Sequence, residues 1–148
     1  MKGISILGST GSIGCNTLKV IEHLGGFRVV AMAAGRNIEK FAQQVAKFEP
    51  ELVSVDCEEN VDELADILRT ARMRVPEIVC GSDGLIQVAT NSEADIVVSA
   101  TVGAVGFVPT LRAIEAGKRI ALANKETLVM AGELMTAAAA KSGAEVLP

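Results

Sequence analysis

The sequence predicts an α/β protein with a doubly wound, mostly parallel sheet of about seven strands and helices on both faces. Apolar segments of strand length alternate with segments of helical periodicity along almost the whole chain. Hydrophobic residues make up 49% of the 148 residues and charged residues 22%, as expected for a sheet buried on both faces. No linker composition, repeat or low-complexity stretch interrupts this pattern, so we expect one domain over residues 1–148.

The first half of the chain predicts four strands and three helices. Ile4 to Leu7 is a short apolar strand, a helix begins near Ser12, and residues 27–32 return as a second strand, which completes a βαβ unit. Phe41, Val45 and Phe48 share one face of a helix over 38–48. A strand at 52–55, a helix at 62–72 and a strand at 76–80 follow.

The second half continues the alternation. A helix is predicted at 83–90, a buried strand at 95–100, strands at 119–123 and 144–147, and a helix at 126–141. Pro109 suits the first position of a further helix, and Gly117 suits the residue just beyond its C-terminus.

A glycine-rich turn from Gly8 to Gly14 lies between the first strand and the first helix. Gly8 lets the strand end in a tight turn, Gly11 lets the backbone approach a pyrophosphate, and Gly14 lets the helix pack close to the sheet. The N–H groups at the helix N-terminus favour an anion at the same place. The spacing is one residue longer than the dinucleotide fingerprint in its first gap, so a turn without a ligand is the alternative. We predict a Rossmann-like nucleotide site.

The end of the second strand distinguishes the two nicotinamide cofactors. An NAD site usually has an acid there to accept from the ribose 2′-hydroxyl, whereas an NADP site has an arginine for the 2′-phosphate. This chain has Gly35-Arg36-Asn37 and no acid. We therefore predict NADPH rather than NADH, with a solvated loop charge as the alternative role for Arg36.

Two later strand ends carry further candidates. Thr101 is placed to contact the cofactor's ribose or pyrophosphate, and Gly103 and Gly106 permit close approach of the backbone, unless they only form a helix-entry turn. The segment 124–126, Asn-Lys-Glu, combines an amide, a cation and a carboxylate where a nicotinamide and its substrate would meet. Chance polarity before a helix is the alternative.

Composition argues against several other classes of protein. The net charge of −4 gives no reason to expect nucleic-acid binding, and no apolar run approaches membrane-spanning length. Three cysteines without a C-x-x-C pair predict neither a disulfide framework nor a zinc site. Because a strand follows the first three residues directly, we expect no signal peptide and a cytoplasmic protein.

The chain resembles the 1-deoxy-D-xylulose 5-phosphate reductoisomerase family over its whole length. The segment 7–14, LGSTGSIG, matches the opening motif of that family, and 122–129, LANKETLV, resembles its second signature. The pair at this separation, with Gly35-Arg36-Asn37 between, is highly specific.

The resemblance implies roles for individual residues. Thr10, Gly11, Ser12 and Ile13 would hold the pyrophosphate, and Gly35, Arg36 and Asn37 the adenosine 2′-phosphate side. Asn124 and Glu126 would contact the cofactor toward its nicotinamide half, and Lys125 would touch the sugar-phosphate substrate. The family rearranges 1-deoxy-D-xylulose 5-phosphate and reduces the product with NADPH to 2-C-methyl-D-erythritol 4-phosphate in isoprenoid biosynthesis. It uses Mg²⁺ or Mn²⁺, and a homodimer is expected.

The sequence departs from the family pattern at its end. Residues 146–148, Val-Leu-Pro, resemble the lead-in to the family's metal-binding Asp-x-Glu-His segment, which is not in this sequence. We therefore expect an NADPH-binding domain that lacks the metal-binding and C-terminal domains and is inactive alone. A free-standing NADPH-binding module or redox sensor, and another reductase of the aspartate-semialdehyde or homoserine dehydrogenase kind, are the alternatives.

Overall fold

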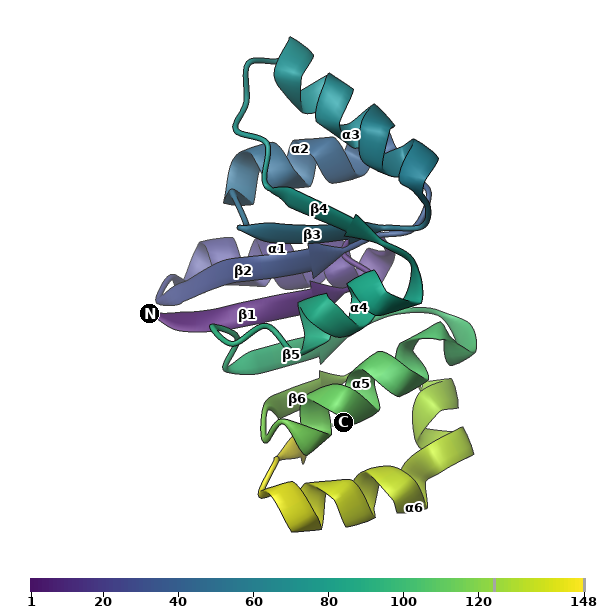
Figure 1. Cartoon of the computed structure of the whole chain (residues 1–148). Helices are drawn as coiled ribbons and strands as arrows, with labels where there is room; N and C mark the ends of the chain where they lie inside the picture. The colour runs from purple at the N-terminus through teal and green to yellow at the C-terminus, as the bar shows by residue number, and fades with distance from the viewer. Residues whose placement is uncertain (124, 148) are drawn as a thin grey trace.

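A computed structural model describes residues 1–123 and 125–147 and contains one seven-stranded parallel sheet (Figure 1). The strands lie in the order β4-β3-β2-β1-β5-β6-β7. They are β1 (Lys2–Leu7), β2 (Phe27–Ala33), β3 (Leu52–Val55), β4 (Glu77–Cys80), β5 (Ile96–Ser99), β6 (Arg119–Leu122) and β7 (Val146–Leu147). The helices are α1 (Ser12–Leu24), α2 (Ile38–Phe48), α3 (Glu58–Thr70), α4 (Gly81–Ala89), α5 (Phe107–Glu115) and α6 (Lys125–Ser142), with a 3₁₀ turn, η1 (Gly103–Gly106), before α5.

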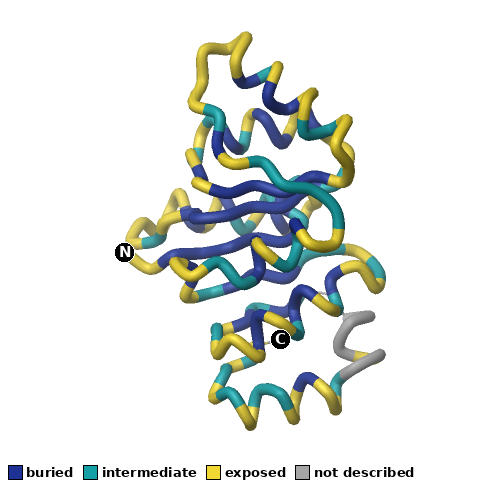
Figure 2. Tube along the Cα trace, viewed as in Figure 1, coloured by how far each residue is buried: buried dark blue, intermediate teal, exposed yellow. Residues whose placement is uncertain are grey.

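The helices form two layers, and each layer closes a separate core against the sheet. One core holds buried side chains of α1, α2 and α3, such as Leu18, Phe41 and Leu64. The other holds side chains of α4, α5 and α6, such as Val88 and Ile114. The two central strands, β1 and β2, are buried along most of their length (Figure 2). The predicted doubly wound fold is confirmed.

The connection reverses direction between β1 and β5. From β1 the chain winds outward through β2, β3 and β4, and then returns across the sheet to place β5 on the other side of β1. In open α/β sheets, ligands bind beyond the carboxyl ends of the strands at such a reversal. The fold therefore places its ligand crevice over the ends of β1, β2 and β5.

The helix at 38–48 and the strand at 52–55 have the predicted bounds, and most other predicted elements differ by one or two residues at an end. Helix α3 begins at Glu58 rather than at residue 62, because Glu58 and Glu59 occupy its first turn and favour the positive end of the helix dipole. The prediction that Pro109 is the first residue of a helix was wrong, since α5 begins at Phe107. Pro109 is tolerated at the third position because N–H groups in a first turn have no partner within the helix. Gly117 adopts φ +78 just beyond the helix end, as expected.

Candidate functional site

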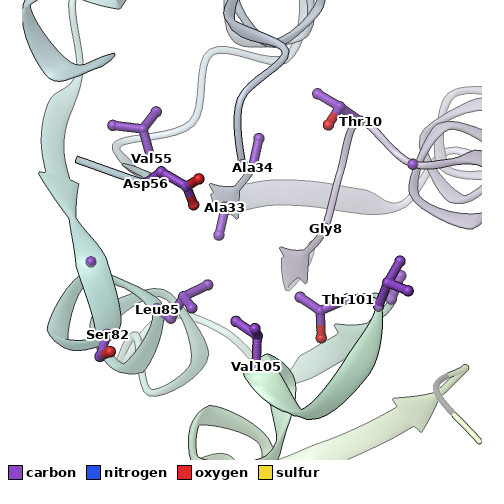
Figure 3. A pocket seen from close by; sticks show the side chains of 15 residues that line it. Gly8, Thr10, Ala33, Ala34, Val55, Asp56, Ser82, Leu85, Thr101 and Val105 are labelled. Carbon is purple, nitrogen blue, oxygen red and sulfur yellow. The ribbon is translucent and has the colours of Figure 1, made fainter. Parts of the chain in front are cut away.

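A pocket of about 500 Å³ opens over the carboxyl ends of the strands, at the reversal between β1 and β5 (Figure 3). Five segments line it, one after each of five strands. The lining residues are Gly8, Thr10 and Gly11 after β1, Ala33, Ala34 and Gly35 at the end of β2, Val55 and Asp56 at β3, Gly81, Ser82 and Leu85 after β4, and Ala100, Thr101, Val102 and Val105 after β5. The volume is within the range of pockets that take small molecules and cofactors.

Two glycines of the β1 turn are required by the fold itself. Gly8 adopts φ +84, and a Cβ there would lie 2.7 Å from the Ala100 carbonyl oxygen. A Cβ on Gly14 would overlap the Gly8 carbonyl oxygen and lie 2.6 Å from the Ser9 Cα. Gly14 therefore lets α1 begin directly against the turn, as the sequence predicted.

Gly11 differs from the other two glycines of this turn. It is the N-cap residue of α1 with φ −72, a conformation open to any residue. The nearest atom to a Cβ would be the Gly8 carbonyl oxygen at 3.7 Å, an ordinary contact. Gly11 lines the pocket. Within the described structure, the space that a side chain would fill at Gly11 is left open toward the pocket.

The N-terminus of α1 is not neutralised by its own residues. No side chain caps it, and its first turn contains no acidic residue. By contrast, Asn37 caps α2 by accepting from the Lys40 N–H at 3.3 Å, and Glu39 lies in its first turn. The unpaired N–H groups and the dipole of α1 thus leave a partial positive charge at the pocket. This arrangement can bind a phosphate.

Side chains of two helices contact backbone carbonyl oxygens of the glycine turn. Gln44 of α2 donates from Nε2 to the Ser9 carbonyl oxygen at 2.8 Å. The Cys15 thiol of α1 lies 3.7 Å from the same oxygen and 3.6 Å from the Thr10 carbonyl oxygen. These contacts fix the carbonyl side of the turn, so its other side faces the pocket.

At the end of β2, Arg36 pairs with a residue from the next strand. Its Nε lies 3.4 Å from Oδ2 of Asp56, and the Arg36 side chain is 91% exposed. Both belong to the rim where β2 and β3 end. Gly35 lines the pocket beside them, and a Cβ there would meet only Asp56 Oδ1 at 3.9 Å.

On the β5 side, Thr101 lines the pocket as predicted, but Gly106 has a structural role. A Cβ on Gly106 would overlap Thr101 Oγ1, so this glycine lets η1 pack against the threonine. Gly106 is buried and is not one of the residues that line the pocket, so its expected role in admitting a nucleotide stays a prediction.

The pocket gathers some of the predicted site residues and leaves others outside. Gly8, Thr10, Gly11, Gly35 and Thr101 line it. Ser12 and Ile13 are exposed on the first turn of α1, and Ile13 lines a separate apolar groove between α1 and β5–β6. Arg36 and Asn37 lie beyond the pocket lining, at its rim. Asn124 and the side chains of Lys125 and Glu126 lie outside the described residues.

Sequence reasoning missed several lining residues, chiefly Asp56, Ser82, Leu85 and Val105. Asp56 directly follows the predicted strand 52–55, so the rule that ligands bind after strand ends would have found it. The others depend on how α4 and η1 cross the sheet. No local pattern indicates that.

Two other kinds of feature are absent from the described residues. Among the side chains that the structure describes, no group of three or more His, Cys, Asp or Glu is placed to hold a metal ion. Among the described helices, none has the length and apolar character needed to span a membrane.

The fold and the pocket define a Rossmann-like α/β domain with its pocket at the carboxyl ends of the strands. Comparison with known proteins gives the family. The model of the 1-deoxy-D-xylulose 5-phosphate reductoisomerase family matches residues 4–132. This chain belongs to the 1-deoxy-D-xylulose 5-phosphate reductoisomerase family.

Curated relatives of that name include proteins from Symbiobacterium thermophilum, 56% identical over 99% of this chain, and Halalkalibacterium halodurans, 51% identical over 100%. The chain spans 38% of the length of each.

Solved structures of the family share the fold closely. A reductoisomerase in complex with NADPH, fosmidomycin and magnesium superimposes with a TM-score of 0.93 at 40% identity, covering 100% of this chain and 36% of that one. The Zymomonas mobilis enzyme in complex with NADPH gives 0.91 at 34% identity, covering 99% and 38%. A homoserine dehydrogenase from Thiobacillus denitrificans reaches 0.57 at 24% identity, covering 99% and 28%, which shows a shared fold alone.

Proposed function

We propose that this chain is the NADPH-binding domain of an enzyme that converts 1-deoxy-D-xylulose 5-phosphate to 2-C-methyl-D-erythritol 4-phosphate in isoprenoid biosynthesis. The single observation that carries the nucleotide assignment is Gly11. It caps α1 and faces the pocket, and no described neighbour requires a glycine there. A pyrophosphate against the turn accounts for the missing side chain.

In this proposal the pyrophosphate lies over the turn after β1. The backbone N–H groups of Ser12 and Ile13, at the N-terminus of α1, donate to it, and Thr10 lines the same space. The nicotinamide half extends toward β5, where Thr101 lines the pocket, and onward to Asn124 and Glu126. Lys125 then contacts the substrate.

The adenosine half extends the other way, over β2 and β3. Gly35 allows close approach of the ribose, and Arg36 reaches the 2′-phosphate with its two terminal amino groups, since the pair with Asp56 uses only Nε. Asn37 already uses Oδ1 as a helix cap, so its amide N–H₂ is the group left for the phosphate. Arginine in place of an acid after β2 supports NADPH over NADH.

Catalysis by the full-length enzyme is assigned to residues beyond this domain. A divalent cation, Mg²⁺ or Mn²⁺, would polarise the ketone and hydroxyl of the substrate. The described side chains offer no ligand cluster for it. Homodimerisation of the full-length enzyme and a cytoplasmic location complete the proposal.

Calorimetric titration of the purified chain with NADPH, and separately with NADH, tests this function. We expect NADPH to bind more tightly, with no requirement for Mg²⁺ and no turnover of 1-deoxy-D-xylulose 5-phosphate. Arg36→Asp should abolish the preference for NADPH, whereas Arg69→Asp, at an exposed arginine of α3 paired with Asp66, should keep it. No binding of either nucleotide contradicts the domain assignment, and an unchanged preference in Arg36→Asp contradicts the role of that residue.

A further inference from the structure

One charged side chain lines the described part of the pocket, and it is acidic. Asp56 follows β3 directly, and Figure 3 shows its carboxylate directed into the hollow. A negative charge near the phosphates of a dinucleotide would repel them and weaken binding. The carboxylate therefore needs a partner that donates hydrogen bonds.

The position of Asp56 along the sheet indicates which part of a dinucleotide it meets. Neighbouring strands are about 4.8 Å apart, so the end of β3 lies about 10 Å from the glycine turn of β1. The ribose of a nucleotide separates its phosphate from its base. With the pyrophosphate over β1 and the ribose over β2, the base lies over β3, beside Asp56.

The lining at this end of the pocket suits a flat base. Val55, Leu85 and Ala34 provide apolar surface, and Gly81 adds no side chain. Val55 and Ala34 are buried beneath the rim. The Asp56 carboxylate stands at the edge of this apolar surface (Figure 3). An aromatic ring placed on it would present its in-plane substituents to the carboxylate.

The Asp56 carboxylate has an oxygen left for this contact. Arg36 Nε pairs with Oδ2 at 3.4 Å, and within the described part of the chain no hydrogen bond reaches Oδ1. A carboxylate only accepts hydrogen bonds. Of the common purine substituents, an exocyclic amine matches it and a carbonyl oxygen repels it.

We propose that Asp56 is a specificity-determining residue that accepts a hydrogen bond from the exocyclic amine of the adenine base. This rests on the proposed function, because it places the adenosine half of NADPH over β2 and β3. Arg36 contacts the 2′-phosphate and Asp56 contacts the base. The ion pair between these two side chains therefore fixes their positions relative to each other.

The test compares NADPH with its hypoxanthine analogue, in which a carbonyl oxygen replaces the amine, by calorimetric or fluorescence titration. We expect the unmodified chain to bind NADPH at least about ten-fold more tightly than the analogue, because hydrogen bonds to charged groups are strong. In Asp56→Ala the preference should fall to within about two-fold. Asp83→Ala removes the same charge from an exposed position of α4 outside the pocket lining and should keep the preference.

The outcomes separate this inference from the function on which it rests. If the unmodified chain binds neither NADPH nor NADH, the domain assignment is wrong. If it binds NADPH and the analogue equally, NADPH binding stands and base recognition by Asp56 is wrong. If Asp56→Ala weakens both nucleotides equally and keeps the preference, Asp56 acts on Arg36 or the ribose, which also overturns the inference. Equal binding of NADPH and the analogue by the unmodified chain refutes the inference even where Asp56→Ala does not fold.

Discussion

Replacing two glycines of the β1 turn by alanine, one at a time, should separate folding from binding. In Gly14→Ala the new Cβ would overlap the Gly8 carbonyl oxygen and lie 2.6 and 2.7 Å from Ser9 Cα and C. All of these are backbone atoms, so no flexible side chain can move aside. Overpacking of this kind costs about 1–3 kcal/mol. For a domain of this size, the melting temperature should fall by about 2–12 °C.

Gly11→Ala should have the opposite effects, with little change in stability and a loss of NADPH affinity. The nearest atom to the new Cβ is 3.7 Å away, and φ −72 is open to alanine. The loss of a glycine N-cap and the gain from a less flexible unfolded chain are both small, so stability should change by less than about 1 kcal/mol. The methyl group projects into the space proposed for the pyrophosphate. NADPH affinity should therefore fall about ten-fold or more.

Thermal and urea unfolding measure the first effect, and titration with NADPH measures the second. Each variant serves as the control for the other, since both place one methyl group in the same turn. Gly14→Ala with the stability of the unmodified chain would refute the close packing of α1 on the turn. Gly11→Ala with full NADPH affinity would refute the placement of the pyrophosphate.

Three further outcomes are expected. Gln44→Ala should lower the unfolding free energy by about 1–2 kcal/mol and weaken NADPH binding, because it frees the carbonyl side of the glycine turn; urea titration and nucleotide titration measure the two effects. Ser99→Ala should cost about 1–3 kcal/mol, because it removes the buried 2.9 Å hydrogen bond to Thr110, and adding Thr110→Val should recover part of that loss. Burial lowers the pKa of Lys118 below 10.5, and the negative charge of Asp95 offsets part of this lowering. The unfolded chain then binds more protons at alkaline pH, so this group's contribution to stability rises as the pH climbs toward 10.5; Lys118→Met should remove that rise in urea titrations across the alkaline range.

The order of strands and helices was predictable because it depends on local patterns. Helix 38–48 and strand 52–55 have the predicted bounds, since a clear apolar face and a short β-branched run indicate them. Helix starts were less predictable. Phe107 begins α5 two residues before the proline that seemed to mark it, because a first turn tolerates proline at more than one position.

Local patterns likewise predicted some residues of the candidate site and not others. Gly8 and Thr101 were found because they lie just after strands, and parallel strands bring such residues to one edge of the sheet, whereas the glycine spacing of the turn indicated Gly11. Ser82 and Val105 line the pocket because α4 and η1 cross over that edge. Ile13, although adjacent to the turn, faces a different groove because α1 rotates its side chain away from the sheet edge.

The fold class, the glycine-rich turn and the resemblance to the family could be predicted from the sequence, because periodicity, glycine spacing and a paired motif are all local features. The difference between Gly14, which packing requires, and Gly11, which faces open space, is visible only in the folded structure. The folded structure also joins Arg36 to Asp56, which are 20 residues apart, at the rim of one pocket. The reason is physical. A contact between two strand ends depends on which strands are neighbours, and strand order follows from the packing of the whole sheet rather than from any local segment.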